Sequence, residues 1–144
     1  MEKGIAAGIC QQFEIPDVDI RTYSPLTLAY IGDCIFELVI RTVVVGKGNA
    51  RPDSLNRRAS RIAKAHTQAV IIEYLEEMLT AEEADIYRRG RNAHSRTMAK
   101  NATVADYRKA TGLEALAGYL YLTDQFERLL ELIKTAVSGL KLEI

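Results

Sequence analysis

The stretch Leu28-Ala29-Tyr30-Ile31-Gly32-Asp33-Cys34-Ile35-Phe36-Glu37 places a carboxylate inside a long apolar run. At helical spacing, Asp33 shares a face with side chains that are mostly apolar: Leu26, Ala29, Tyr30, Phe36, Glu37 and Ile40. A carboxylate in such surroundings must be protonated, pair with a cation or bind a metal, because an isolated buried charge is costly. We therefore expect a helix here in which Asp33 has a chemical role.

A second acid, Glu114, lies in the apolar stretch 113–122. Its neighbours at helical spacing are all small: Ala110, Thr111, Ala117 and Gly118. Small side chains let another helix approach closely. Asp33 is the natural candidate for an acid on that helix, and its carboxylate would then lie near Glu114. Two converging carboxylates suit Mg²⁺, which can orient a water and bind a phosphate. From spacing alone, pairing of both acids with arginines or with solvent stays open.

The hydrophobic periodicity predicts an all-α fold, and no β-alternation persists along the chain. Helices are expected over 25–46 after the Ser24-Pro25 cap, from Pro52, from the Thr80 to Glu83 capping box to about Gly90, and over 104–122. Around His66 the second helix either continues or restarts. Asp124 is expected to cap a last amphipathic helix that ends at Gly139.

Length and composition indicate one domain over residues 1–144. The chain is 48% hydrophobic and 26% charged, which is ordinary for a globular protein with its own core. Cys10 and Cys34 give no disulfide framework and are expected to be small buried hydrophobes. Because the N-terminus lacks a signal sequence and no apolar stretch suits a bilayer, we expect a cytoplasmic protein.

The formal net charge of zero hides segregated charges. Residues 85–110 contain seven Lys or Arg and two Asp, and residues 51–66 contain five Lys or Arg and one Asp. Residues 91–103 are expected to form a long basic loop, of a kind that is often functional. The side chains suited to RNA phosphates are Arg88, Arg89, Arg91, Asn92, His94, Arg96, Lys100, Asn101, Lys64, His66 and Arg108. A solvated charged face is the alternative.

Several separated motifs carry a family resemblance over residues 24–130. Residues 30–37 resemble the signature helix of ribonuclease III, and residues 113–122 resemble its second acidic helix. Arg89-Gly90-Arg91-Asn92-Ala93, followed by Lys100-Asn101 and Tyr107-Arg108, is similar to the compact bacterial branch called Mini-ribonuclease III. The motifs occur in the family's order, which makes the resemblance specific.

The resemblance implies an all-helical, homodimeric endonuclease domain that cleaves double-stranded RNA with Mg²⁺, or with Mn²⁺ in its place. Asp33 and Glu114 would be the metal-binding catalytic acids. Glu37 is a further metal-ligand candidate, although pairing with Arg41 one turn later is an equal alternative. The implied substrate is the precursor of 23S ribosomal RNA, with a ribosomal protein as a candidate helper. The chain is expected to lack the family's double-stranded-RNA-binding domain.

The chain departs from the larger ribonuclease III enzymes at two positions. Ala29 and Thr111 stand where those enzymes carry acids, so fewer carboxylates should hold metal more weakly. This departure supports an alternative, a catalytically silent dimer that binds RNA or the ribosome, and a helical protein-interaction dimer is a third reading. His66 and His94 are expected to contact RNA or solvent rather than act in acid/base catalysis. The aromatic residues Tyr30, Phe36, Tyr119 and Tyr121 are expected in the core or a dimer interface.

Overall fold

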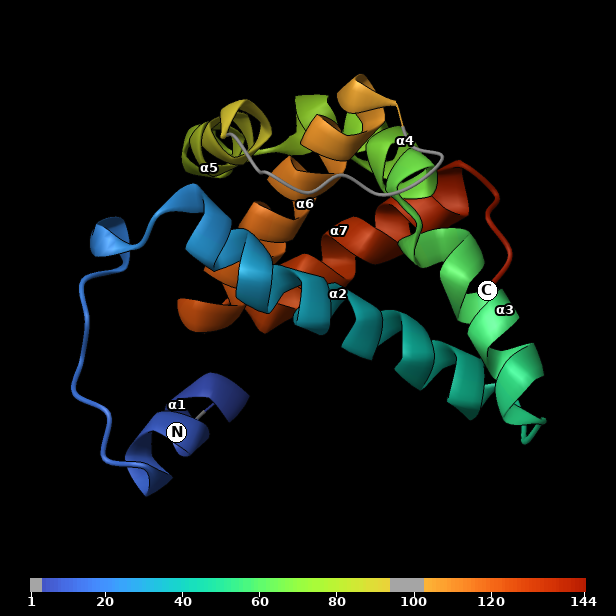
Figure 1. Cartoon of the computed structure of the whole chain (residues 1–144), viewed down its shortest axis with the longest axis horizontal. Helices are drawn as coiled ribbons and strands as arrows, with labels where there is room; N and C mark the ends of the chain where they lie inside the picture. Colours follow the sequence, from blue (N-terminus) through green and yellow to red (C-terminus); the bar gives the residue numbers. More distant parts are fainter. Residues whose placement is uncertain (1–3, 94–102) are drawn as a thin grey trace.

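The computed structural model describes residues 4–93 and 103–144, and the described residues form helices and connections without a strand (Figure 1). This result confirms the predicted all-α class. The α helices are α1 (Ile5–Gln12), α2 (Pro25–Gly46), α3 (Pro52–Ala63), α4 (Ala65–Leu75), α5 (Ala81–Asn92), α6 (Val104–Leu122) and α7 (Phe126–Gly139). Two 3₁₀ turns, η1 (Ile20–Thr22) and η2 (Glu76–Met78), lie between them.

Local signals set the starts of three helices as expected. The Ser24 hydroxyl accepts a hydrogen bond from the Thr27 amide at 3.2 Å, directly before Pro25 opens α2. Thr80 and Glu83 form the predicted capping box, with reciprocal hydrogen bonds of 2.9 and 3.1 Å at the start of α5. α6 begins at Val104 behind a Thr103 cap, in agreement with the predicted range.

α6 is the central helix of the structure (Figure 1). Every residue from 110 to 121 is buried except Glu114, which is half-buried. The reason is that α2, α4, α5 and α7 all pack around it, and α2 makes the most extensive contact. A helix that is surrounded in this way must be apolar or small on all sides, which explains the composition of this stretch.

Two glycines allow α2 and α6 to cross with their backbones in contact. A β-carbon at Gly32 would overlap the carbonyl oxygen of Glu114, and one at Gly118 would overlap the carbonyl oxygen of Leu28. Any larger residue at either position would push the helices apart. The predicted close approach at Glu114 is therefore present, and α2 supplies the matching small residue.

Other details differ from the sequence-based expectations. The second predicted helix restarts at Lys64, whose extended ψ of 153° separates α3 from α4. α5 continues to Asn92, so Arg91 and Asn92 lie in a helix rather than in the expected loop. The N-terminal region, which showed no clear periodicity, forms α1 and η1.

The prediction that Asp124 caps α7 is wrong. Asp124 has a φ of 60°, a left-handed conformation that commonly follows the end of a helix. The Gln125 amide donates back to the Leu120 carbonyl at 2.7 Å, so these two residues terminate α6. α7 starts after Gln125 without a side-chain cap.

A buried ion pair joins α5 to α7. Glu83 is 4% exposed, and its carboxylate accepts hydrogen bonds of 2.9 and 3.0 Å from the Arg128 guanidinium. This bond to Arg128 lowers the pKa of Glu83 despite the opposing effect of burial. Arg128 also donates to the Met78 carbonyl at 3.0 Å, so one arginine holds three segments together.

The length of α2 would allow it to span a bilayer, but Asp33, Glu37 and Arg41 interrupt its apolar character. Within residues 4–93 and 103–144, none of the helices is both long enough and apolar enough to cross a membrane.

We predict that Gly32→Ala destabilises the fold by about 2 kcal/mol or more, because the added methyl group meets helix backbone that cannot rotate away. Gly46→Ala, at the other end of α2, is the matched control because nothing lies near its β-carbon position. Urea unfolding of both variants would measure the difference. Equal stabilities would show that the α2–α6 crossing is not tightly constrained.

Candidate active site

An open groove of about 900 Å³ lies between α2 and α6. Asp33 and Glu37 reach it from α2, and Glu114 reaches it from α6. The groove is lined by Leu26, Ala29, Tyr30, Ile31, Asp33, Cys34, Glu37, Leu38, Arg41, Tyr107, Thr111 and Glu114. The glycine crossing therefore sets acids from two distant parts of the sequence beside each other.

Burial and the neighbouring acids raise the pKa of Glu114 in this groove. Burial is the largest cause that raises the pKa of Glu114 to about 9, and hydrogen bonding to Asp33 adds to the shift. The negative charges of Asp33 and Glu37 raise it further. Without a bound cation, a pKa of about 9 leaves Glu114 protonated at neutral pH.

The structure corrects the expectation that Asp33 is the desolvated acid. Asp33 is exposed, whereas Glu114 is half-buried within the otherwise buried part of α6. The face of α2 that carries Asp33 is also less buried than its composition suggests, because Tyr30 is 83% exposed and Leu26 is 37% exposed. Phe36, Tyr119 and Tyr121 are buried in the core, in agreement with the prediction.

Glu37 lines the groove one turn after Asp33 and pairs with Arg41. Its Oε2 lies 3.2 Å from Nη2 of Arg41, in the i,i+4 arrangement that the sequence left open. Both side chains are well exposed, so the pair is only loosely held. The pairing does not remove Glu37 from the acidic groove, since its charge still acts on Glu114.

The described residues offer few ligands for a metal. In the part of the chain that the structure describes, no three His, Cys, Asp or Glu side chains come together as a cluster that could hold an ion. Two adjacent carboxylates nevertheless fit Mg²⁺, which is often bound through one or two carboxylates and keeps several waters. The donor set therefore suits a sparsely held magnesium ion.

Ala29 and Thr111, the two uncharged residues singled out in the sequence, both line the groove. Both residues are buried, and the Thr111 hydroxyl donates a 2.9 Å hydrogen bond to the Tyr107 carbonyl. The threonine side chain thus bonds to its own helix. Neither position supplies a charged ligand to the groove.

The basic side chains of α5 and α6 have varied surroundings. Arg88 pairs with Asp85, whereas Arg89 and Arg108 are exposed. The guanidinium of Arg91 lies 5.5 Å from the centre of the Tyr87 ring, which fixes its direction at the end of α5. Asn92 is exposed next to it. The remaining loop candidates, His94, Arg96, Lys100 and Asn101, lie outside the described residues.

Two further candidates lie at the junction of α3 and α4. Lys64 is exposed at the point where α3 ends. His66 lies with its Nδ1 2.9 Å from Oδ2 of Asp106, in the first turn of α6. His66 thus has a protein partner that the sequence pattern did not indicate, and it ties α4 to the start of α6.

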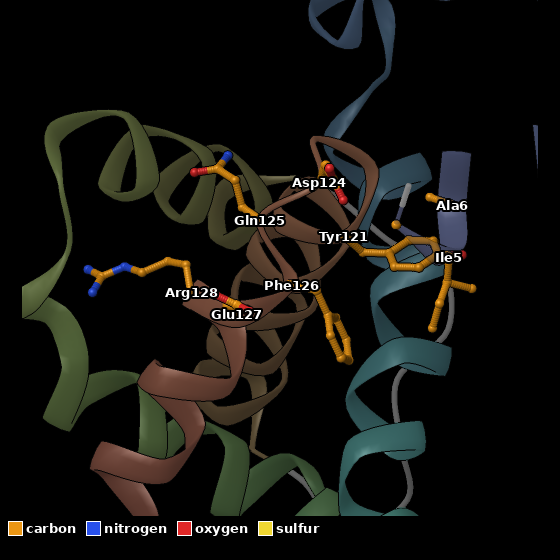
Figure 2. A pocket seen from close by; sticks show the side chains of 9 residues that line it. Ile5, Ala6, Tyr121, Asp124, Gln125, Phe126, Glu127 and Arg128 are labelled. Carbon is orange, nitrogen blue, oxygen red and sulfur yellow. The ribbon is translucent and has the colours of Figure 1, made fainter. Parts of the chain in front are cut away.

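A separate pocket of about 610 Å³ lies between α1 and the turn from α6 to α7, and Figure 2 shows its lining side chains. A β-carbon at Gly4 would overlap the Asp124 carboxylate, so Asp124 lies against the start of α1. Arg128, which also borders the pocket, is already bound to Glu83. We interpret this pocket as the attachment of α1 to the fold.

Both cysteines are free thiols, but the expectation that both are buried is wrong, since Cys34 is exposed and Cys10 is only partly buried. Cys34 is exposed because it lies on the groove side of α2, and Cys10 is half-buried on α1. Burial raises the pKa of Tyr121, and the nearby Cys10 and Cys34 raise it further. The two thiols therefore approach the same tyrosine from different helices.

Sequence reasoning did not assign Arg41, Leu38 and Tyr107 to the site, although all three line the groove. Arg41 had a usable signal, because it follows Glu37 by four residues and so lies on the same helical face as that acid. Tyr107 had none, because its place in the groove depends on how α6 packs against α2.

The all-helical fold is that of a ribonuclease III domain, and the family Ribonuclease III domain matches residues 26–125. The chain is 48% identical to Mini-ribonuclease 3 of Enterococcus faecalis over 121 residues, which cover 83% of this chain and 92% of that protein. It is 40% identical to Mini-ribonuclease 3 of Clostridium tetani over 126 residues, covering 87% of this chain and 83% of the relative.

A solved structure supports the same conclusion. The crystal structure of a protein from Fusobacterium nucleatum superposes with a TM-score of 0.77 at 32% identity, covering 85% of this chain and 94% of that one. The chain therefore belongs to the Mini-ribonuclease 3 branch of the ribonuclease III family. This membership makes it an endoribonuclease and confirms the resemblance found in its motifs.

The raised pKa of Glu114 predicts a pH-dependent stability in the absence of metal. The folded pKa of about 9 exceeds the ordinary value of 4.5, so the stability that the proton confers is lost as the pH rises between these values. Glu114→Gln removes the titration and should be more stable than the parent by about 1–3 kcal/mol at about pH 8. This advantage should shrink toward about pH 5.

Urea unfolding in EDTA across this pH range measures the effect. Glu127→Gln is the control, because Glu127 is an exposed glutamate outside the groove. Parallel profiles for the parent and Glu114→Gln would contradict the prediction.

Proposed function

We propose that the protein is a Mg²⁺-dependent endoribonuclease that cleaves double-stranded RNA, with Asp33 and Glu114 as the catalytic acids. The observation that carries the proposal is that these two acids, one from α2 and one from α6, line the same open groove of a ribonuclease III domain. An open groove suits a long polymer better than a closed pocket does. The names of the relatives add support for ribonuclease chemistry.

Asp33 and Glu114 would hold the cation, with Mn²⁺ as a substitute for Mg²⁺. When bound, Mg²⁺ orients and acidifies a water and offsets negative charge on the phosphoryl oxygens. Glu114 must release its proton to act as a ligand, and a cation beside it favours the charged form. Glu37 is a further candidate ligand, one turn from Asp33.

Most of the proposed RNA contacts lie in the sequence between the two segments that line the groove. Arg88, Arg89, Arg91 and Asn92 come from α5, Arg108 from α6 and Lys64 from the α3–α4 junction. Arginine and asparagine suit the phosphates and 2′-hydroxyls by which proteins mostly bind duplex RNA. The proposed contacts also include His94, Arg96, Lys100 and Asn101. His66, which lies beside Asp106, is a further proposed RNA contact.

We further propose that the protein acts as a homodimer. Tyr30 and Leu38 are large and exposed beside the acids, so a second copy could cover them. A two-fold dimer carries one acidic groove per protomer and can therefore cut both strands of a duplex. The family resemblance extends the proposal to a cytoplasmic role on precursor 23S ribosomal RNA, with a ribosomal protein as helper.

Replacing the acids tests the catalytic assignment. We expect Asp33→Asn or Glu114→Gln to lower the cleavage rate of duplex RNA by about a thousandfold or more, because each removes a charged ligand from a site with few of them. Binding of the duplex should persist. A gel assay with Mg²⁺ or EDTA, together with sequencing of the product ends, measures cleavage and identifies the cut position.

Asp17→Asn is the matched control, since Asp17 is exposed and lies outside the groove. Full turnover in Asp33→Asn would overturn the role of Asp33. Duplex binding by the unaltered protein without cleavage under any metal condition would favour the alternative, a catalytically silent RNA- or ribosome-binding dimer.

The scarcity of carboxylates predicts weak metal binding without RNA. With Ala29 and Thr111 in the groove, at least one ion should be held mainly by water and substrate phosphate. Crystals soaked in Mn²⁺ without RNA should therefore show fewer than two fully occupied sites per groove in anomalous difference maps. Two full sites would contradict this expectation.

A further inference from the structure

Arg41 is the one basic side chain among the described residues that line the acidic groove. The same lining includes the acids Asp33, Glu37 and Glu114. A groove of this charge repels the phosphates of an RNA strand unless cations offset the repulsion. Among the described residues of the groove, Arg41 therefore supplies the positive charge that offsets part of the negative charge of the acids.

The present partner of Arg41 holds it only weakly. The ion pair with Glu37 has an Nη2 to Oε2 distance of 3.2 Å, and the Arg41 and Glu37 side chains are 62% and 42% exposed. Exposed pairs at i,i+4 contribute little, because water solvates both groups well when they separate. Exchange of Glu37 for another anion is consequently easy.

A phosphate is a better partner than an exposed glutamate for this side chain. The guanidinium of arginine presents a planar fork that binds two phosphate oxygens at once. Arg41 follows Asp33 by eight residues, which is about 12 Å along the helix axis. This spacing sets Arg41 away from the acid pair along α2, so a phosphate that it binds would be another than the one that is cleaved.

We propose that Arg41 binds a backbone phosphate of the RNA strand in the groove and exchanges Glu37 for that phosphate when the duplex enters. The inference rests on the proposed function, since it needs duplex RNA in this groove. It assigns a binding residue within the site itself, in addition to the basic side chains of α5 and α6.

The test measures duplex RNA affinity against salt concentration in an Asp33→Asn background, which is expected to bind without cleaving. Adding Arg41→Gln should weaken binding by about threefold to tenfold and reduce the slope of log K against log salt by about one, as for one lost phosphate contact. Arg41→Lys should keep the slope but bind less tightly than the background, because it keeps the charge and loses the fork.

Arg21→Gln is the matched control. Arg21 is also exposed and pairs with a nearby acid, since its Nη2 lies 2.9 Å from Oδ2 of Asp19, but it lies outside the groove. This change should leave affinity and slope unaltered. Thermal unfolding of each variant checks that the fold is kept, which the exposure of both arginines leads us to expect.

A double-mutant cycle tests the exchange itself. Glu37→Gln frees Arg41 and removes a negative charge, so it should strengthen binding. Part of this gain should disappear when Arg41→Gln is also present, because no cation is then left to release. Equal gains in both backgrounds would overturn the exchange.

The outcomes separate the two proposals. If the parent protein neither binds nor cleaves duplex RNA, the proposed function fails, and the role of Arg41 fails with it. If cleavage is normal and Arg41→Gln has the affinity and salt slope of Arg21→Gln, only the Arg41 proposal is overturned. A change in the monomer–dimer equilibrium with an unchanged slope would likewise overturn it and assign Arg41 to the subunit interface.

Discussion

The contact on which the site depends is the backbone crossing of α2 and α6 at Gly32 and Gly118. Neither glycine has room for a β-carbon, because the carbonyl groups of Glu114 and Leu28 occupy that space. Asp33 and Glu114 lie next to this crossing in their helices, so the separation of their carboxyl groups follows from it. Close helix packing, which lies far from chemistry in most proteins, here determines the geometry of the acid pair.

Much of the fold could be predicted from the sequence because the decisive signals are local. The Ser24-Pro25 start, the Thr80 capping box and the range of α6 depend on short spacings and are present as expected. Asp124 shows the limit of such signals, since an aspartate suits both a helix start and a left-handed helix end. Only the packing of α7 decides between the two.

The sequence identified the two acids of the candidate site, but it did not show how buried each of them is. Helical periodicity placed Asp33 on a face with Tyr30 and other apolar residues, and this suggested burial. Tyr30 is 83% exposed, because α6 covers one side of α2 and leaves the groove side open. The pattern of one helix cannot show which of its apolar residues a neighbour covers, so Glu114, surrounded on α6, is the acid whose pKa is raised.

The charged groups of the groove partly offset one another. Burial and its acidic neighbours keep Glu114 protonated without a cation, so the groove avoids a third full negative charge beside Asp33 and Glu37. Arg41 offsets part of the charge that remains. A divalent cation would change this balance by favouring ionised Glu114, and an RNA phosphate would change it by attracting Arg41. With Ala29 and Thr111 uncharged, the groove holds few fixed ligands, and loading of metal and substrate should therefore depend on each other.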